Sequence, residues 1–234
     1  MTPKVIDLSH HNIVSDFDHL KEQGIIGIVH KATEGTDFTD PKLKARHYLT
    51  REAGLLWGLY HFLRPFDPTA QATYFLAQTT QLRDNQTLIA VDYEDPTIPL
   101  AALKTFMAAI RRMTGRQPII YAGNVLKEKL AGRPDPELSD LLLWLADHGV
   151  DYTMPPGFPS VPYMRQYTDS GVISGIQGMV DLNEIFMPDE RFSRIWRNEP
   201  LLEPSNPTWQ NDPLHPPAIT LTVPKGTKVS IVEV

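Results

Sequence analysis

The sequence of 234 residues predicts an α/β fold: a TIM-like barrel of five βα units followed by three strands, with a C-terminal Pro-rich tail and β-hairpin. Two observations predict it. Short apolar runs rich in β-branched residues alternate with segments of helical period, as in strands joined by crossover helices. The runs number eight, enough to close a parallel barrel filled by side chains. A doubly wound open sheet would use the same alternation.

The apolar runs place strands at residues 4–8, 25–31, 57–62, 88–94, 118–122, 142–146, 163–167 and 179–183. Helices are expected between the first six strands, at residues 16–23, 41–53, 69–82, 99–113 and 124–131. In the second helix, Asp40 is the expected N-cap and Pro41 the first helical residue. The helical signal fades after residue 146, so the last three strands should be joined by loops.

The composition changes near residue 199. We expect a barrel domain at 1–198, a Pro-rich extended connector at 199–217 and a β-hairpin at 218–234. An isolated hairpin is marginal in water. It is therefore expected to dock on the barrel, on a protein partner or on a second copy of the chain.

Composition excludes several classes of protein. With 22 Lys plus Arg against 28 Asp plus Glu, the net charge of -6 offers no basic surface for nucleic acid. The absence of cysteine removes disulfides, thiolate metal sites and a Cys nucleophile. No signal-peptide pattern or long apolar run is present, so we expect cytoplasmic synthesis and no membrane insertion.

Polar side chains end most of the apolar runs, and this separates a barrel from an open sheet. Barrel enzymes gather their chemistry at the carboxyl ends of the strands, so these side chains should converge on one mouth. The strand-end residues are Asp7, His30, Lys31, His61, Asp92, Glu94, Tyr121, Trp144, Gln166, Tyr167 and Asp181.

Asp92-Tyr93-Glu94 closes one of the runs and places two carboxylates two residues apart. In extended backbone both side chains point to one face. Such a pair suits acid-assisted cleavage of a glycosidic bond, in which one carboxyl donates a proton and the other stays ionised near the anomeric carbon. Two solvated acids in a loop are the alternative.

These motifs together resemble glycoside hydrolase family 25, the Ch-type lysozymes, over about residues 4–186. The matching segments, in the family's order, are Asp7-Leu8-Ser9-His10-His11-Asn12, His30-Lys31-Ala32-Thr33-Glu34-Gly35-Thr36, Gly58-Leu59-Tyr60-His61-Phe62, Val91-Asp92-Tyr93-Glu94, Ile120-Tyr121, Leu143-Trp144-Leu145-Ala146, Gln166-Tyr167 and Gly178-Met179-Val180-Asp181-Leu182-Asn183. The resemblance implies a barrel that cleaves the β-1,4 bond between N-acetylmuramic acid and N-acetylglucosamine in bacterial peptidoglycan. Members serve as phage endolysins or autolysins, so we expect action on the cell wall after release from the cell or signal-independent export.

The family's acidic positions fall on Asp7, Asp92, Glu94 and Asp181. Glu94 is the expected general acid, its pKa raised by partial burial and by an ionised Asp92. Asp92 either attacks the anomeric carbon or supports attack by the substrate's own acetamido group, which we favour; both routes retain the anomeric configuration. Asp7 and Asp181, on the first and last strands, are expected to orient Asp92 or water.

Six further residues are expected to contact substrate: Lys31, Phe62, Tyr121, Trp144, Gln166 and Tyr167. Core packing is the competing explanation for each aromatic residue. One departure from the family is Arg165, which replaces a usual Trp and puts the shape of one sugar subsite in doubt.

Several rival functions have weaker support. A metal hydrolase would use Asp7, His30, His61 and Asp181, but the only close histidines are adjacent and would point apart on a strand, so no metal or cofactor is expected. No nucleophile elbow or phosphate-binding glycine motif is present. A chitinase-like glycosidase and a non-catalytic glycan-binding module remain as alternatives.

Overall fold

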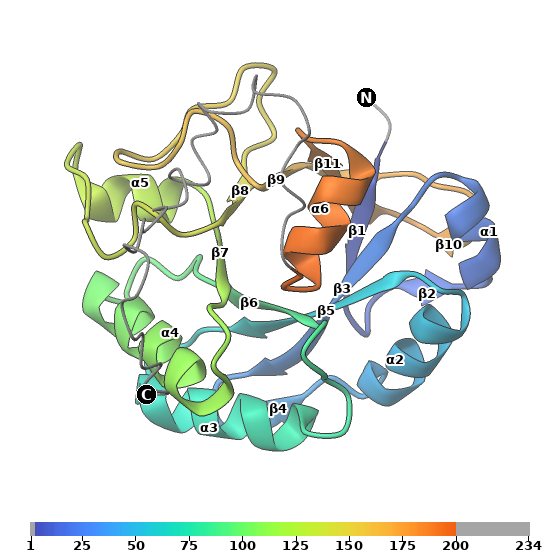
Figure 1. The fold of residues 1–234 in the computed structure, drawn as a ribbon, viewed down its shortest axis with the longest axis horizontal. Coiled ribbons are helices and arrows are strands. Elements are labelled where there is room, and N and C mark those ends of the chain that lie inside the picture. Colours follow the sequence, from blue (N-terminus) through green and yellow to red (C-terminus); the bar gives the residue numbers. More distant parts are fainter. Residues whose placement is uncertain (1–2, 200–234) are drawn as a thin grey trace, which may run out of the picture. The chain divides into compact units, whose positions relative to one another are not determined.

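The computed structural model describes residues 3–199, in which eight strands form a closed barrel (Figure 1). The sheet closes because β1 pairs with β3 on one side and with β11 on the other. The predicted TIM-like barrel is therefore confirmed. Its strands are β1 (Val5–Leu8), β3 (Gly27–Glu34), β5 (Leu56–Phe62), β6 (Leu88–Asp92), β7 (Ile119–Ala122), β8 (Leu143–Ala146), β9 (Met164–Gly171) and β11 (Val180–Ile185).

All of the barrel strands run in the same direction except one. From β1 through β3 to β9, neighbouring strands are parallel. Strand β11 runs antiparallel to both of its neighbours, β9 and β1. Residues at the start of β11 therefore lie at the same end of the barrel as the carboxyl ends of the other strands.

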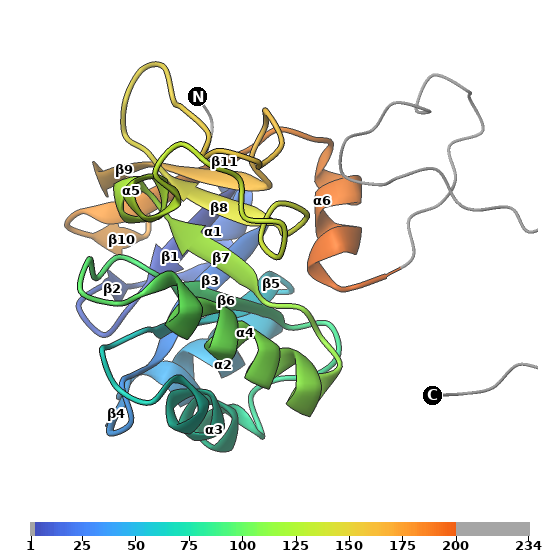
Figure 2. The same ribbon diagram turned by 90° about the vertical axis from the view of Figure 1, so that its left-hand side faces the viewer.

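Five helices follow the first five barrel strands, as predicted. Helices α2, α3 and α4 lie along the outside of the barrel (Figures 1 and 2). The five are α1 (Phe17–Glu22), α2 (Leu43–Glu52), α3 (Pro68–Thr79), α4 (Leu100–Thr114) and α5 (Asn124–Leu130).

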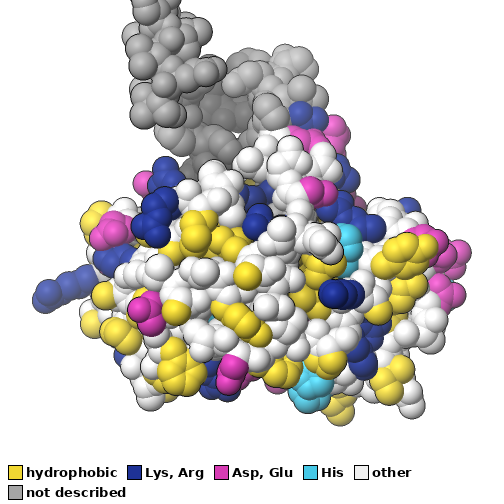
Figure 3. Space-filling view, turned by 90° about the horizontal axis from the view of Figure 1, so that it is seen from below, with side chains coloured by type: hydrophobic (Ala, Val, Ile, Leu, Met, Phe, Trp, Pro, Cys, Tyr) yellow, Lys and Arg dark blue, Asp and Glu magenta, His cyan; other side chains and the backbone are white. Residues whose placement is uncertain are grey.

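The barrel wall is apolar on both faces, because successive side chains of a strand point to opposite sides. On β1, Val5 belongs to the cluster inside the barrel and Ile6 to the layer between strands and helices. Parallel strands covered on both faces read as continuous apolar runs, which is the pattern seen in the sequence. In the view of Figure 3, hydrophobic side chains are scattered among polar ones.

A sixth helix, α6 (Asp189–Trp196), packs on the amino ends of the strands and was not predicted. Trp196 and Phe192 are fully buried, and Trp196 Nε1 donates a 3.0 Å hydrogen bond to the Trp57 carbonyl. A Cβ on Gly58 would lie 2.9 Å from the Trp196 ring, so glycine permits the close approach. The helix is short, and its orientation depends on these distant contacts.

Helix α2 begins later than predicted. It runs from Leu43, with Lys42 at the N-cap position and no side-chain cap. Asp40 is not the N-cap: its carboxylate is buried among histidines and the Lys42 amide. The predicted N-cap position was wrong because residues 41–42 form a turn ahead of the helix, although Asp40 Oδ1 still accepts from the Lys42 amide at 2.9 Å.

Three two-residue strands were also missed, since two residues carry no periodic signal. They are β2 (Ile13–Val14), which pairs with β10 (Ile176–Gln177), and β4 (Phe38–Thr39), which pairs with β3. No helix within residues 3–199 is long and apolar enough to span a bilayer. All but the first residue of the predicted connector, and the whole predicted hairpin, lie outside the described residues.

Candidate active site

A pocket opens at the carboxyl-end mouth of the barrel, where the sequence predicted that polar side chains would converge. All four predicted acids line it, together with five of the six predicted substrate contacts. The lining residues are Asp7, Ser9, His11, Lys31, Tyr60, Phe62, Asp92, Glu94, Tyr121, Trp144, Gln166 and Asp181.

Asp92 and Glu94 face the pocket from either side of Tyr93, whose ring points the opposite way. Tyr93 is fully buried and its hydroxyl donates to the Ile98 carbonyl at 2.7 Å. Strand β6 ends at Asp92, but the Tyr93 amide still donates to the Tyr121 carbonyl at 2.9 Å, so the backbone stays extended through the pair. The predicted alternation of side chains is confirmed.

This first pair of acids shares a hydrogen bond and a desolvated setting. Asp92 is 5% exposed, and burial followed by the charge of Glu94 raises its pKa well above the usual range. Glu94 reaches solvent at the mouth, yet desolvation of its carboxyl by the pocket walls raises its pKa too. Burial thus disfavours the charged form of both carboxyls, so the two titrate together, and the bond from Asp92 lowers the pKa of Glu94.

The second pair is Asp7 and Asp181, which are direct partners in the β1–β11 ladder. The predicted neighbourhood of the first and last strands is thus confirmed. Asp181 is the second residue of β11 and reaches the mouth because that strand is antiparallel. Burial and the charge of Asp7 raise the pKa of Asp181 to about 9. At neutral pH Asp181 therefore keeps its proton and donates it to Asp7.

Two amides also hold Asp7. Gln166 Nε2 lies 3.2 Å and Asn183 Nδ2 2.9 Å from Asp7 Oδ2. Trp144 Nε1 in turn donates to Asn183 Oδ1 at 2.6 Å, and the Tyr121 hydroxyl to Gln166 Oε1 at 2.9 Å. Burial raises the pKa of Asp7, and these bonds oppose that rise. Gln166 therefore lines the pocket and also donates a hydrogen bond to Asp7.

The aromatic residues form the pocket floor. Trp144 is 1% exposed, with its ring 4.5 Å from that of Tyr121 and 6.4 Å from that of Tyr60. Phe62 is half-buried at the wall. Tyr167 is a correction: it does not line the pocket and packs on the outer apolar layer, because its strand neighbour Gln166 takes the inward position.

Lys31 stands at the pocket wall in an ion pair. Its Nζ lies 2.5 Å from Glu34 Oε2 and 4.9 Å from the centre of the Phe62 ring. Arg64 also contacts Glu34. Burial alone would raise the pKa of Glu34, but its bonds with Lys31 and Arg64 lower it. The positive charge of Lys31 favours the ionised form of Asp92.

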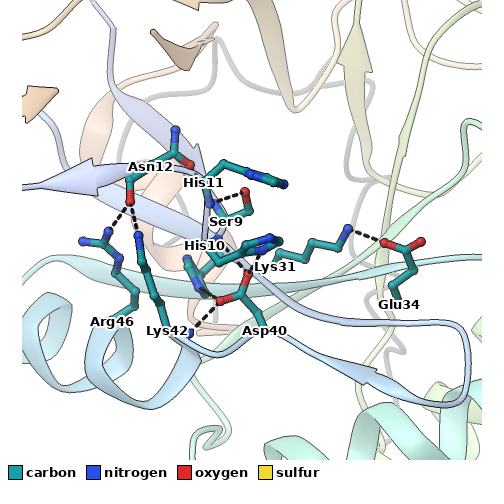
Figure 4. Close-up of polar contacts among 10 residues, drawn as sticks. Ser9, His10, His11, Asn12, Lys31, Glu34, Asp40, Lys42 and Arg46 are labelled. Carbon is teal, nitrogen blue, oxygen red and sulfur yellow. Dashed lines mark hydrogen bonds and ion pairs between the residues drawn. The ribbon is translucent and has the colours of Figure 1, made fainter. Parts of the chain in front are cut away.

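The turn after β1, at residues 9–12, brings Ser9 and His11 to the pocket (Figure 4). Buried Asp40 holds it: Oδ2 accepts from the His10 amide at 2.7 Å and from His10 Nδ1 at 3.1 Å, and Oδ1 from His30 Nε2 at 3.2 Å. Burial opposes ionisation of Asp40, but these bonds lower its pKa well below the usual range.

Helix α2 fastens the far end of the same turn. Lys42 Nζ and Arg46 each donate to the Asn12 carbonyl at 2.8 Å. The position of the turn, and with it the placement of His11, is therefore set by residues outside the pocket.

His30 and His61 do not join Asp7 and Asp181. His30 packs on Trp57 and bonds Asp40, and burial lowers its pKa. His61 lies between strands and helices, bonded to Gln71 and stacked on Phe106; burial lowers its pKa to about 4. The ligand set of the rival metal hydrolase is not assembled.

Arg165 lies outside the catalytic pocket. It is 2% exposed and packs over the Tyr152 ring, on the side of β9 opposite to Gln166. The departure from the family at residue 165 therefore affects the outer side of β9. The expected effect on the shape of a sugar subsite was misplaced, because this side chain does not line the pocket.

Sequence reasoning did not select Ser9, His11 or Tyr60 as site residues, and it missed His148, which bonds Gln166. The signal that could have found Ser9 and His11 is their closeness to Asp7 in the sequence, since they lie in the turn after β1, where strand alternation no longer applies. His148 has no such signal.

Four carboxylates at the carboxyl-end mouth of a TIM-like barrel define a glycoside hydrolase type of site. A family model described as glycosyl hydrolases family 25 matches residues 6–176. The chain belongs to this family, as the motifs suggested.

Relatives agree. The chain is 32% identical over 195 residues to Lysozyme M1 of Streptomyces globisporus, covering 76% of this chain and 66% of that protein. It is 31% identical over 189 residues to the autolytic lysozyme of Clostridium acetobutylicum, covering 77% of this chain and 55% of that one. The crystal structure of a bacterial lysozyme from Streptomyces coelicolor superposes with a TM-score of 0.74 at 28% identity, over 86% of this chain and all of that one. The chain thus spans about half to two thirds of these two curated relatives.

Proposed function

We propose that the protein hydrolyses peptidoglycan, cutting the β-1,4 bond between N-acetylmuramic acid and N-acetylglucosamine with retention of configuration. Family membership and the lysozyme names of its relatives support the substrate class. The observation that carries the chemistry is the Asp92–Glu94 pair in one pocket, each with a raised pKa.

Glu94 is the general acid. It stands at the open side of the pocket, where a glycosidic oxygen can approach, and desolvation raises its pKa, which favours the protonated form that an acid needs. Cleavage breaks the bond between the anomeric carbon and the leaving oxygen, which takes the proton of Glu94. Glu94 then removes a proton from the water that attacks the anomeric carbon.

Asp92 assists the substrate's acetamido group. Its Oδ1 is buried without a hydrogen-bond partner among the described residues, and a buried carboxylate oxygen requires one. An acetamido N–H donating to Oδ1 would stabilise ionised Asp92 and shift the shared proton onto Glu94. The acetamido oxygen, made more nucleophilic, would attack the anomeric carbon, and water would later open that intermediate. Two inversions at one carbon give net retention.

Mass spectrometry of the muropeptides released from purified peptidoglycan tests the linkage. Reducing-end muramic acid is the expected product, whereas reducing-end glucosamine would contradict the proposed bond. Chitin oligomers assayed in parallel address chitinase-like specificity, and binding without release would indicate a glycan-binding module.

Proton NMR of the first product formed tests the stereochemistry. The β-anomer should appear before mutarotation. An initial α-anomer would contradict both the substrate-assisted route and direct attack by Asp92.

A further inference from the structure

His148 follows β8 and reaches the pocket indirectly, through Gln166. Its Nε2 lies 3.0 Å from Gln166 Oε1, the oxygen that also accepts from the Tyr121 hydroxyl at 2.9 Å. Two donors on Oε1 turn the other end of the amide toward Asp7, where Nε2 donates at 3.2 and 3.4 Å. The reversed amide would place its carbonyl oxygen against the Asp7 carboxylate and its N–H groups against two donors. His148 and Tyr121 therefore fix the orientation of Gln166.

Arg165 holds the backbone on both sides of His148. Its Nε donates to the Asp147 carbonyl at 2.7 Å, and its NH2 donates to the Gly149 carbonyl. Its NH1 bonds Glu184 at 3.0 Å, which fixes the guanidinium from the next strand. Because the group is almost fully buried, loss of these bonds would leave two carbonyls unpaired.

Only arginine can make this set of contacts. A guanidinium offers five N–H donors in a rigid plane and can span two carbonyls and a carboxylate at once. The Trp usual at this position in the family has one N–H, and lysine is a point donor. The departure at residue 165 is thus coupled to the segment that carries His148.

A second cation secures the same segment from α5. Lys127 Nζ lies 2.9 Å from Asp147 Oδ2 and 3.0 Å from Thr153 Oγ1. The other ring nitrogen of His148, Nδ1, has only a 4.0 Å approach to exposed Asp169. The bond to Gln166 is therefore the one that orients the imidazole.

We propose that His148 is a positioning residue for the reaction, held by Arg165, and that it keeps the Gln166 amide donating to Asp7. The inference rests on the proposed function, since the reaction it serves is peptidoglycan cleavage. It adds a residue outside the pocket lining and assigns a role to the Arg165 replacement.

A matched pair of variants at one position tests the hydrogen bond. In His148→Gln the side-chain amide can donate where imidazole Nε2 did, whereas His148→Ala cannot. We expect His148→Ala to lower kcat about 5- to 20-fold, the size of one lost hydrogen bond, with KM within about twofold. His148→Gln should restore kcat to within about threefold, and Glu190→Gln, on the exposed surface of α6, should match the wild type. Equal impairment of both His148 variants, or an unimpaired His148→Ala, would overturn the proposal.

A double variant separates positioning from stability. Arg165→Lys keeps the charge but cannot span both carbonyls, so its kcat should fall toward that of His148→Ala. Arg165→Lys combined with His148→Ala should be no slower than His148→Ala alone, although its Tm should be lower. Multiplied losses of kcat would show that Arg165 acts independently of His148.

Carboxyl titration of Asp7 and Asp181 by carbon-13 NMR gives a readout that needs no substrate. In His148→Ala the pair should titrate at higher pH than in the wild type, because Asp7 loses a donor, and in His148→Gln its titration should stay unchanged. Unchanged titration in His148→Ala would refute the positioning role even if the wild type cleaves peptidoglycan. Conversely, the shift could appear while the cleavage assay fails, which would reject the proposed function alone.

Discussion

The two carboxylate pairs of the pocket differ in how their oxygens are satisfied. Asp7 accepts from Asp181, Gln166 and Asn183, so the β1–β11 pair is held by protein groups. Asp92 Oδ1 is equally buried but has no partner among the described residues, and Glu94 is open to solvent. Both pairs are desolvated and share protons. The difference indicates that the Asp7–Asp181 pair is a fixed support and the Asp92–Glu94 pair is arranged to react.

Glu94→Gln should produce the largest effect on activity. Removal of a positioned general acid typically costs about 10² to 10⁴ in rate, so peptidoglycan clearing should nearly vanish, with Tm almost unchanged. Glu190→Gln, on exposed α6 surface, is the matched control and should be fully active. Activity of Glu94→Gln within tenfold of wild type would mean that the reactive pair has been misassigned.

Asp7→Asn should damage both fold and activity, unlike Glu94→Gln. An amide at this position would turn N–H groups toward existing donors, at a cost of about 1 to 3 kcal/mol for unsatisfied buried groups. We expect kcat to fall about 10- to 100-fold if the support orients the reactive pair. Thermal unfolding and kinetics on one preparation measure the loss of stability and the loss of activity together. An unchanged Tm would contradict the view that Asp7–Asp181 supports the fold while Asp92–Glu94 does not.

Asp181→Asn should stabilise the protein at alkaline pH while costing only a few-fold in kcat. The folded pKa of about 9 lies above the unfolded value near 3.9, so the folded state binds the extra proton and stability falls as pH rises between those values. Asn mimics the protonated acid and donates to Asp7 without this penalty.

Tm measured from pH 4 to 9 tests the sign of that effect. After allowance for solvent screening the gain at pH 8 to 9 is on the order of 1 kcal/mol, or about 2 to 4 °C for a domain of this size, and it should disappear near pH 4. A parallel Tm decline in both proteins would show that Asp181 is already ionised at neutral pH.

Asp40→Asn should have the smallest effect on activity, because it loosens the turn beside Asp7 without touching either pair. One oxygen that accepts from His10 or His30 becomes a donor, so we expect a loss of about 1 to 3 kcal/mol in stability and a two- to threefold rise in KM. Exposed Asp37→Asn serves as the control. A loss of kcat as large as that of Asp7→Asn would show that the turn at residues 9–12 helps to hold the Asp7–Asp181 pair in place.

Much of the fold could be read from the sequence, because the signals are local. Each barrel strand is a continuous apolar run, since both of its faces are buried, and each of the first five is followed by an amphipathic helix. The placement of Asp92 and Glu94 also follows from a local rule, the alternation of side chains around Tyr93.

Other features had no local signal. The start of α2 was misplaced because residues 41–42 form a turn ahead of the helix, where Asp40 is held by His10 and His30 as well as by the Lys42 amide. The helix α6 was missed because its buried aromatic residues depend on distant partners: Trp196 packs on Gly27 and Gly58, more than a hundred residues earlier, and Phe192 on Tyr163.

The sequence by itself predicted the strands of the barrel and the common face of Asp92 and Glu94, because strand period and residue type are properties of adjacent residues, and the resemblance to the family added Asp7 and Asp181. The tertiary structure alone decided their protonation and support. Asp181 reaches the mouth only through an antiparallel strand, and Arg165 grips the segment of His148 only after β9 and β11 are paired. Burial and long-range hydrogen bonds set proton affinity, and neither exists before the chain has folded.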